Sequence, residues 1–582
     1  MTSFASFRAV SGQPWRARRD GGDDLGIALI DQLLLARGVD PTDLDRHRAP
    51  TLRDFLPDPS VFADMDKAAS RLADAVDAKE KIAIFGDYDV DGATSAALLT
   101  LLLRRLGNEP MIYIPDRLME GYGPSGKALV ELKEQGASLA ITVDCGAQAF
   151  EALAEAAAAG LEVIVCDHHQ CSSSLPQAVA MINPNRLDES DEAAAHGHLA
   201  AVGIAFLLGV ALLRELRKRG RFVNGNAEPK ILDLIDIVAL GTVADVAKLK
   251  SLNRAFVTQG LKVMAGRQNI GLAALADAAR LVKSPTSRDL GFALGPRINA
   301  GGRVGKSDLG VRLLTATDPE QARIIAAELD RLNEERRAIE QIVSDEASNQ
   351  AIAQADAPLI IVSGTGWHPG VVGIVASRLK EKYGRPAIVI AEDEAGIGKG
   401  SGRSISGVDL GAAILAAKDN GLLLAGGGHA MAAGVTIAAG GLEPLRAFLH
   451  DRLATTIETA RGDRTLTLDA LLSPGGVAGG LCDELDAAGP YGAGWPAPRI
   501  AAGPARLIRT SIVGNGHVRG IAAGDDGKSF KWIAFRAADT PLGQALLSSA
   551  PDMRWWLAGT IKRDEWTGGN AAEMHVEDAA PA

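Results

Sequence analysis

The chain has 582 residues, which is more than one domain usually holds, so three or four domains are expected. Its formal net charge is −11 and its pI is about 5.5, which argues against a nucleic-acid binder with a basic surface but allows a local basic groove. Only four cysteines occur, so a disulfide framework is not expected. The first residues lack an apolar export signal, and the longest apolar run (199–213) is shorter than the roughly 20 residues that span a bilayer, so we expect a cytoplasmic protein.

From residue 81 to residue 167, short apolar runs alternate with helical patterns. This βαβ repetition predicts a parallel sheet with right-handed crossovers. The predicted strands are 81–85, 111–114, 139–143 and 163–165, and the predicted helices are 93–106, 126–135, 150–159, 199–219 and 231–240.

The second half predicts a long connector helix at 319–349, a second α/β unit at 358–453, and then short β-like runs with glycine turns. Those runs (506–513, 530–535 and 555–561) favour an OB-type barrel, a fold that often binds single-stranded nucleic acid. The predicted fold class is therefore α/β, with two parallel-sheet lobes joined by the helix and a C-terminal OB-like β-barrel. The predicted domains are an N-terminal segment (1–60), the first lobe (61–318), the connector (319–355), the second lobe (356–461) and the β domain (462–582).

Three alternating carboxylates follow the first predicted strand: Asp87, Asp89 and Asp91. An extended backbone would point all three to one side, and Gly92 would then open the next helix. Such close like charges repel unless cations lie among them, so we expect a divalent-metal site. A solvated acidic loop and a calcium loop are the alternatives. The calcium loop would need a downstream Glu, but residues 93–106 are apolar.

The sequence Asp167-His168-His169 follows another predicted strand, and Asp144 follows a third. Ligands of parallel sheets gather at the carboxyl ends of strands, so Asp87, Asp144 and Asp167 are expected to converge. The alternative for the histidines is an exposed pair at a strand end. Cys166 and Cys171 flank this cluster, but no second Cys or His pair stands at zinc spacing, so a zinc site is not expected.

These motifs, in this order and with Asp245, resemble the DHH phosphoesterase family. The segments 295–303, 366–379 and 398–404 resemble its RecJ branch, and 426–434 resembles the glycine-rich motif of the associated DHHA1 domain. The likeness runs from about residue 50 to about residue 500. It implies two Mn²⁺ or Mg²⁺ ions and catalytic roles for Asp87, Asp167, His168 and His169. The metal ligands that it implies are Asp87, Asp89, Asp91, Asp144, Asp167, His168 and Asp245.

Arginines in glycine-rich segments form a second candidate site. We expect Arg297, Arg303 and Arg403 to lie in turns that approach phosphate, although each arginine alone also fits a solvated loop. The resemblance adds four substrate contacts: Arg117, Asn299, Ser401 and His429. It also implies that Ser401 and Arg403 hold a 5′-terminal phosphate.

Four aromatic residues of the β domain either stack on bases or fill its core: Trp532, Phe535, Trp555 and Trp556. One departure from the RecJ-like pattern is Trp495, which stands where asparagine is expected.

The resemblance implies a 5′→3′ exonuclease that degrades single-stranded DNA to 5′-mononucleotides in repair and recombination. It further implies a monomer that takes single-stranded DNA with a 5′ end, works with a single-strand-binding protein and a helicase, and has no membrane partner. One alternative is a DHH phosphodiesterase for short oligoribonucleotides or cyclic dinucleotides, which would not need residues beyond 462. Another is an inactive replication scaffold, although the metal-binding carboxylates are all present.

Overall fold

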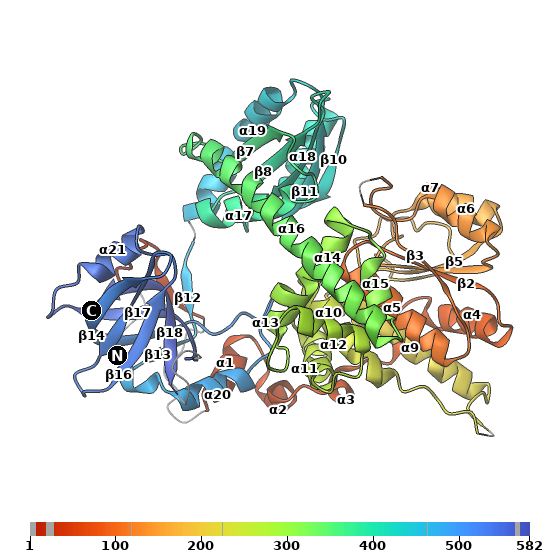
Figure 1. Cartoon of the computed structure of the whole chain (residues 1–582), viewed down its shortest axis with the longest axis horizontal. Helices are drawn as coiled ribbons and strands as arrows, with labels where there is room; N and C mark the ends of the chain where they lie inside the picture. Colours follow the sequence, from red (N-terminus) through yellow and green to blue (C-terminus); the bar gives the residue numbers. More distant parts are fainter. Residues whose placement is uncertain (1–6, 19–27, 118, 224, 463, 565–570) are drawn as a thin grey trace. The chain divides into compact units, whose positions relative to one another are not determined.

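The computed structural model describes residues 7–18, 28–117, 119–223, 225–462, 464–564 and 571–582, so the expectation for the first residues falls partly outside it. The chain forms two compact units (Figure 1). Unit 1 comprises Met1–Tyr113, Gly123–Gly295 and Thr465–Ala582, and unit 2 comprises Ile114–Tyr122 and Pro296–Arg464. No helix in the described ranges is long and apolar enough to cross a membrane.

A five-stranded parallel sheet of order β3-β2-β4-β5-β6 lies at the centre of unit 1. All residues of β2 and β4 are buried because helices cover both faces. Helices α6 and α7 lie on one face, and α5 and α9 lie on the other (Figure 1). The four predicted strands are confirmed, and β6 is an additional edge strand. The strands are β2 (Ile82–Gly86), β3 (Met111–Tyr113), β4 (Leu139–Val143), β5 (Glu162–Cys166) and β6 (Ala180–Ile182). The helices are α4 (Met65–Asp77), α5 (Val90–Arg105), α6 (Gly126–Glu134), α7 (Phe150–Ala158), α9 (Ala201–Lys218), α10 (Ile235–Ala244), α11 (Ser251–Ala265) and α12 (Ile270–Ala278).

A closed β-barrel forms the C-terminal part of unit 1. Strand β14 pairs with both β15 and β17, which closes the circuit β14-β15-β16-β18-β17. Near the start of the chain, β1 (Trp15–Ala17) pairs with β12 (Leu466–Leu468), and Trp15 Nε1 donates to Asp578 Oδ2 at 3.0 Å. The early residues therefore pack with the barrel. Its elements are β13 (Ala470–Leu472), α20 (Gly479–Ala487), β14 (Ile500–Val513), β15 (His517–Ala523), β16 (Ser529–Ala534), α21 (Pro541–Leu547), β17 (Arg554–Arg563) and β18 (Ala572–Pro581).

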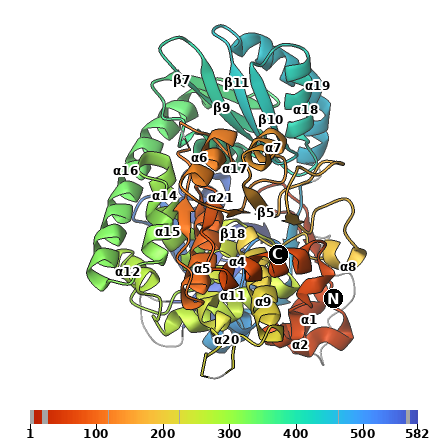
Figure 2. The same cartoon turned by 90° about the vertical axis from the view of Figure 1, so that its right-hand side faces the viewer.

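Unit 2 contains a mixed sheet of order β10-β11-β9-β8-β7, in which β7 and β8 are parallel and the other neighbours are antiparallel. Helices α16 and α17 pack on one face, and α18 and α19 pack on the other (Figure 2). Helix α16 (Pro319–Ile352) confirms the predicted connector. Two α/β lobes, a long helix and a β-barrel together confirm the predicted architecture. The parallel sheet predicted for the second lobe is wrong, because only β7 and β8 of that sheet pair in parallel. The other elements are β7 (Ile360–Thr365), α17 (Val372–Tyr383), β8 (Ala387–Glu392), β9 (Gly398–Arg403), α18 (Leu410–Asp419), β10 (Ala425–His429), β11 (Ala432–Ile437) and α19 (Leu442–Gly462).

The arginines Arg297, Arg303 and Arg403 were expected to lie in glycine-rich turns, and that expectation is wrong for all three. Arg403 ends strand β9, in which a Cβ on Gly400 would stand 2.6 Å from Ile390 and one on Gly402 would stand 2.7 Å from Leu410. The segment with Arg297 and Arg303 is helix α14 (Gly295–Val304). Glycine is required here because neighbouring core atoms are close, and not because the backbone turns.

Candidate metal centre

The loop after β2 carries three of the carboxylates in a tight strand-to-helix turn. Asp87 follows the strand directly, Asp89 caps α5 by accepting from Asp91 N at 2.8 Å, and Asp91 lies in the first helical turn. A Cβ on Gly92 would stand 2.3 Å from the backbone oxygen of Asp87, so this turn requires glycine. The extended arrangement expected for these three residues is therefore wrong, because helix α5 begins inside the motif. The turn nevertheless gathers their carboxylates.

Asp91 is held by the start of helix α9. Its two oxygens accept from Ala201 N at 2.7 Å and Val202 N at 2.9 Å, while the side chain is fully buried. A helix N-terminus stabilises a nearby negative charge by roughly 0.3–1 kcal/mol at the surface, and by up to about 2 kcal/mol where the charged group is partly buried. Burial and the neighbouring charge of Asp89 outweigh this and raise the pKa of Asp91 to about 7. The site therefore binds protons when no cation neutralises it.

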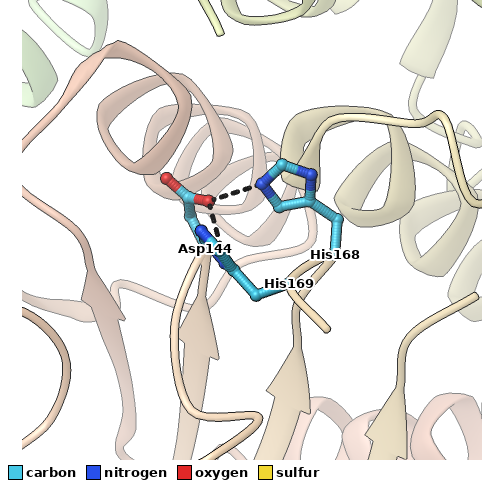
Figure 3. Close-up of side chains that lie close together, drawn as sticks. All are labelled: Asp144, His168 and His169. Atoms are coloured by element: carbon cyan, nitrogen blue, oxygen red, sulfur yellow. Dashed lines mark ion pairs between the residues drawn. The ribbon is translucent and has the colours of Figure 1, made fainter. Parts of the chain in front are cut away.

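Asp144 follows β4 in a left-handed backbone conformation, with φ of 62°. Burial and the charges of Asp91, Asp89 and Asp87 raise its pKa well above the usual value. Figure 3 shows its carboxylate turned toward both histidines: Oδ1 lies 3.1 Å from His168 Nε2 and 4.0 Å from His169 Nδ1. Such a conformation is uncommon for a residue other than glycine, although Asp adopts it more readily than most.

The two histidines have different electrostatic surroundings. Burial and the neighbouring His169 lower the pKa of His168 to about 4, so its ring is neutral and able to bind a metal. Burial also opposes protonation of His169, but its bond to Asp167 raises the pKa above the usual value. Asp167 Oδ1 accepts from His169 Nδ1 at 2.8 Å, and its Oδ2 accepts from Ala147 N at 2.9 Å. Asp167 thus orients His169.

Asp245 caps the C-terminus of α10 and completes the centre. Its Oδ2 lies 4.0 Å from His168 Nδ1, and burial together with the charges of Asp91 and Asp89 raises its pKa to about 9. The position is a C-terminal helix cap whose carboxylate lies in the acidic cluster.

Three overlapping groups of potential ligand atoms arise, each within 4.8 Å. They are Asp144, His168 and His169; Asp91, His168 and Asp245; and Asp87, Asp89 and Asp144. Carboxylate oxygens with one or two imidazoles suit Mn²⁺ and Mg²⁺ better than softer metals. Asp167 belongs to none of these groups, and its oxygens accept from His169 Nδ1 and Ala147 N; its predicted role as a metal ligand stays a prediction.

The cysteines take no part in any such group within the described ranges. Burial raises the pKa of the Cys166 thiol well above its usual value, and the pKa of Cys171 rises to about 11 for the same main reason. Neutral thiols are poor metal ligands.

A second, basic pocket lies wholly within unit 2 and has a volume of about 460 Å³. Arg403 donates to Ser401 Oγ at 2.8 Å, and Arg303 donates to Gly370 O at 2.8 Å. Burial and the charge of Arg117 lower the pKa of Arg403, which shows that cations crowd this pocket. The first turn of α17 also lines it. The lining residues are Arg117, Arg303, Pro369, Gly370, Val372, Gly373, Ile374, Ser377, Lys399, Gly400, Ser401, Arg403 and Gly434.

Strand alternation explains the composition of this pocket. Lys399, Ser401 and Arg403 share one side of β9 and line the pocket, while the glycines between them face the core. A Cβ on Gly373 would stand 3.0 Å from Arg403 Nη2, so the helix start can approach the arginine only as glycine. Lys399 was not among the predicted contacts. The alternation of polar residues with glycine is the sequence signal that could have identified it.

Three predicted substrate residues lie outside this lining. Arg297 pairs with Asp330 of α16 at 2.8 Å. Asn299 lies on α14, and His429 ends strand β10, where its Nδ1 accepts from Met431 N at 3.3 Å. Their predicted contacts with substrate stay predictions.

The barrel places its aromatic residues in two environments. Trp532, Trp555 and Trp556 are buried, which confirms the core interpretation for them. Phe535 is 53% exposed and lies edge-on to His517 and His575, with ring centroids 5.2 Å and 5.0 Å away. All three line a groove of about 2460 Å³ in unit 1. Its cationic lining includes Arg280, Lys283, Arg288, Arg509, Arg519, Lys531 and Lys562.

Comparison with known proteins agrees with this architecture. The family model described as "DHH family, N-terminal domain" matches residues 81–242, and the "DHHA1 domain" model matches residues 356–455. The two matches agree with the parallel sheet, its acidic centre and the mixed-sheet lobe. The chain is therefore in the class of the DHH phosphoesterases. The "RecJ OB domain" model matches residues 468–578.

Individual relatives narrow the class. The chain is 40% identical over 508 residues to a "Single-stranded-DNA-specific exonuclease RecJ" of Dickeya dadantii, covering 84% of this chain and 86% of the relative. A protein with the same description from Bacillus subtilis is 33% identical, with 95% of this chain and 68% of that relative covered. The crystal structure of RecJ with Mn²⁺ from Thermus thermophilus matches with a TM-score of 0.75 at 28% identity, covering 95% of this chain and 75% of that one. The chain belongs to the RecJ family.

The raised pKa values predict a pH-dependent stability. Asp91 and Asp245 have folded pKa values of about 7 and about 9, above the ordinary 3.8, so the folded chain keeps protons that the unfolded chain has lost. Without metal, the Tm should therefore fall as pH rises through these values. Mn²⁺ binds the deprotonated carboxylates, so the Tm increase that it causes should grow over the same range. Differential scanning fluorimetry with and without Mn²⁺ measures both, and an equal Mn²⁺ effect at low and high pH would contradict the assignment.

Proposed function

We propose that the chain is a two-metal-dependent exonuclease that degrades single-stranded DNA from its 5′ end to 5′-mononucleotides. The observation that carries the proposal is the convergence of carboxylates and imidazoles from β2, β4, β5 and α10 on one small volume. Membership of the RecJ family supports it, because the curated relatives are described as single-stranded-DNA-specific exonucleases and the solved relatives hold Mn²⁺ or Mg²⁺.

The residues of the centre fit two divalent cations. Asp87, Asp89 and Asp144 would hold one, and Asp91, His168 and Asp245 would hold the other. When bound, two such ions supply the Lewis acidity that activates water and offsets charge on a phosphodiester. Asp167 keeps the ring of His169 oriented, and the raised pKa of His169 favours its protonated form. A protonated His169 would donate a hydrogen bond to a phosphoryl oxygen as negative charge develops there.

The basic pocket of unit 2 supports recognition of a terminal phosphate. Arg403 with Ser401 offers a guanidinium and a hydroxyl side by side, and Arg117 and Arg303 add positive charge. The first turn of α17 contributes a helix N-terminus, which favours anions. We assign the 5′-phosphate of the strand to this pocket.

The groove of unit 1 supports contact with the rest of a strand. Phe535 is exposed between two histidine rings, which suits stacking with a base, and the surrounding cations suit the backbone phosphates. The local groove also reconciles the net charge of −11 with nucleic-acid binding. The resemblance alone carries the remaining expectations of a cytoplasmic monomer that works with a single-strand-binding protein and a helicase in repair and recombination.

Substitution Asp144→Asn tests the metal-centred mechanism. It keeps the side-chain shape but removes the negative charge of one ligand of the proposed Asp87, Asp89 and Asp144 site, so the rate of strand cleavage should fall at least ~10²-fold. The Tm without metal should rise, because the neighbouring carboxylates then repel less. Asp236→Asn is the matched control, since Asp236 is equally buried but lies outside the ligand groups, and it should keep activity.

The assay is digestion with Mn²⁺ of strands labelled separately at each end. Release of labelled mononucleotide first from the 5′-labelled strand supports the proposed direction. Cleavage of a dinucleotide but not of a long strand would instead support the phosphodiesterase alternative, and no cleavage of either would support the scaffold.

Arg403→Ala tests the terminal-phosphate pocket. A charge-assisted bond is worth about 1.5–3 kcal/mol, so the preference for 5′-phosphorylated over 5′-hydroxyl strands should fall ~10- to 100-fold. Competition between the two strands measures this ratio. Arg331→Ala is the control, because Arg331 is exposed on α16 and pairs with Glu328 and Glu335 instead of lining the pocket. If Arg403→Ala leaves this preference ratio unchanged, the 5′-phosphate does not bind in this pocket.

Phe535→Ala tests the groove of unit 1. Loss of one stacked base should weaken binding of a long single strand by about 1–3 kcal/mol, while cleavage of a very short strand should change little. Fluorescence anisotropy with Ca²⁺ in place of Mn²⁺ measures the affinity. Ile324→Ala, at an exposed apolar position on α16, serves as the control. Equal affinity of the Phe535 variant and the wild type would exclude stacking there.

A further inference from the structure

Residues 488–495, here called the linking segment, lie between α20 and the first long barrel strand and contact the loop that follows Asp245. The N–H of Leu249 donates to Ala493 O at 2.8 Å. Within the segment, Gly492 and Trp495 exchange two backbone hydrogen bonds of 3.0 Å and 3.1 Å, which close a tight turn. A Cβ on Gly492 would stand 2.8 Å from Leu249 Cδ1, so the turn lies directly against the loop.

Arg254, on the first turns of α11, holds the linking segment. It is completely buried and donates to the carbonyl oxygens of Ala488 and Gly489, at 3.3 Å and 3.0 Å. Its guanidinium carbon lies 4.1 Å from the ring centroid of Trp495, whose Nε1 also donates to Ala488 O at 3.2 Å. A buried guanidinium without a carboxylate needs such partners, and an aromatic face provides one.

The preceding residue, Asn253, joins two loops that lead to metal-centre residues. Its Nδ2 donates to Lys248 O at 3.0 Å and to His198 O at 2.8 Å. Lys248 stands three residues after Asp245. His198 stands three residues before Ala201, whose N–H holds the carboxylate of Asp91. Neighbouring side chains of one helix therefore bind the linking segment and the loops of two candidate ligands.

We propose that Arg254 and Trp495 are positioning residues of the metal centre. They fix the linking segment against loop 246–250 and thereby hold Asp245 relative to Asp91 and His168. The inference rests on the proposed function, because it takes these carboxylates to be ligands of the two divalent metal ions. It also gives a role to Trp495, which supplies a ring that an asparagine at this position would lack.

The test compares Trp495→Leu with Trp495→Phe in the full chain, without DNA. Electron paramagnetic resonance of free Mn²⁺ gives the Mn²⁺ dissociation constant. We expect Trp495→Leu to raise the Mn²⁺ dissociation constant ~10-fold, because losing a residue that positions the ligands has an effect of this size. Trp495→Phe keeps an aromatic face and should change the constant less than ~2-fold. Arg254→Lys keeps the charge but loses the planar guanidinium, so it should raise the Mn²⁺ dissociation constant as much as Trp495→Leu does.

Kinetics provide an independent reading. The Mn²⁺ concentration for half-maximal cleavage should rise with the dissociation constant, while the KM for single strands at saturating Mn²⁺ stays unchanged. Trp532→Leu, the same change inside the barrel core, should leave Mn²⁺ affinity unaltered. Circular dichroism shows whether each variant folds. If Trp495→Leu does not fold, the Mn²⁺ dissociation constants of Trp495→Phe and Arg254→Lys are compared instead, and only the second should be raised.

Two outcomes separate this inference from the proposed function. Unchanged Mn²⁺ affinity in Trp495→Leu and Arg254→Lys, with weaker strand binding, would overturn it and leave these residues as anchors of the barrel. If the Trp495 variants bind Mn²⁺ more weakly than the wild type but the wild type cleaves no strand, the exonuclease proposal is overturned and the positioning role is supported.

Discussion

Repulsion among buried carboxylates is the constraint on which the metal centre depends. Five Asp side chains meet at the carboxyl edge of one parallel sheet and at the end of α10, and burial strengthens the repulsion between them. The chain opposes this repulsion locally. The N-terminus of α9 binds Asp91, and three backbone N–H groups and the His169 ring bind Asp167. The balance still favours protonation, so cations that replace those protons stabilise the folded chain.

Unit 2 presents the opposite charge. Its basic pocket gathers guanidinium groups around the first turn of α17, and glycines on β9 and α17 permit the close packing that this requires. An ion-pair network joins α17 to α16, in addition to their shared apolar core. Glu340 of α16 is buried and pairs with Arg336 on the same helix and with Arg378 on α17. An acidic centre for cations and a basic pocket for an anion are complementary requirements of phosphodiester chemistry.

The barrel shows how similar residues acquire different roles from position alone. Trp532 and Phe535 are three residues apart, yet one is fully buried and the other is half exposed. Side chains alternate along β16, so Trp532 faces the core and Phe535, which follows the strand, lies on the other side. Trp495 was identified in the sequence as a departure from the family pattern. In the structure its ring lies beside a buried arginine on the helix that follows the loop after Asp245.

The sequence by itself determined the α/β lobes, the long helix and the barrel, because hydrophobic periodicity reports which face of each element is buried. It also determined the acidic cluster, since carboxylates just after parallel strands must meet at one edge. Only the tertiary structure decided which side chains share a site. It put Arg117 in the pocket with Arg403, placed Arg297 in an ion pair instead, and added Lys399. It also turned Asp167 toward His169, and joined Arg254 to Trp495 across 241 positions of sequence. These pairings depend on distances between elements, which local sequence patterns do not encode.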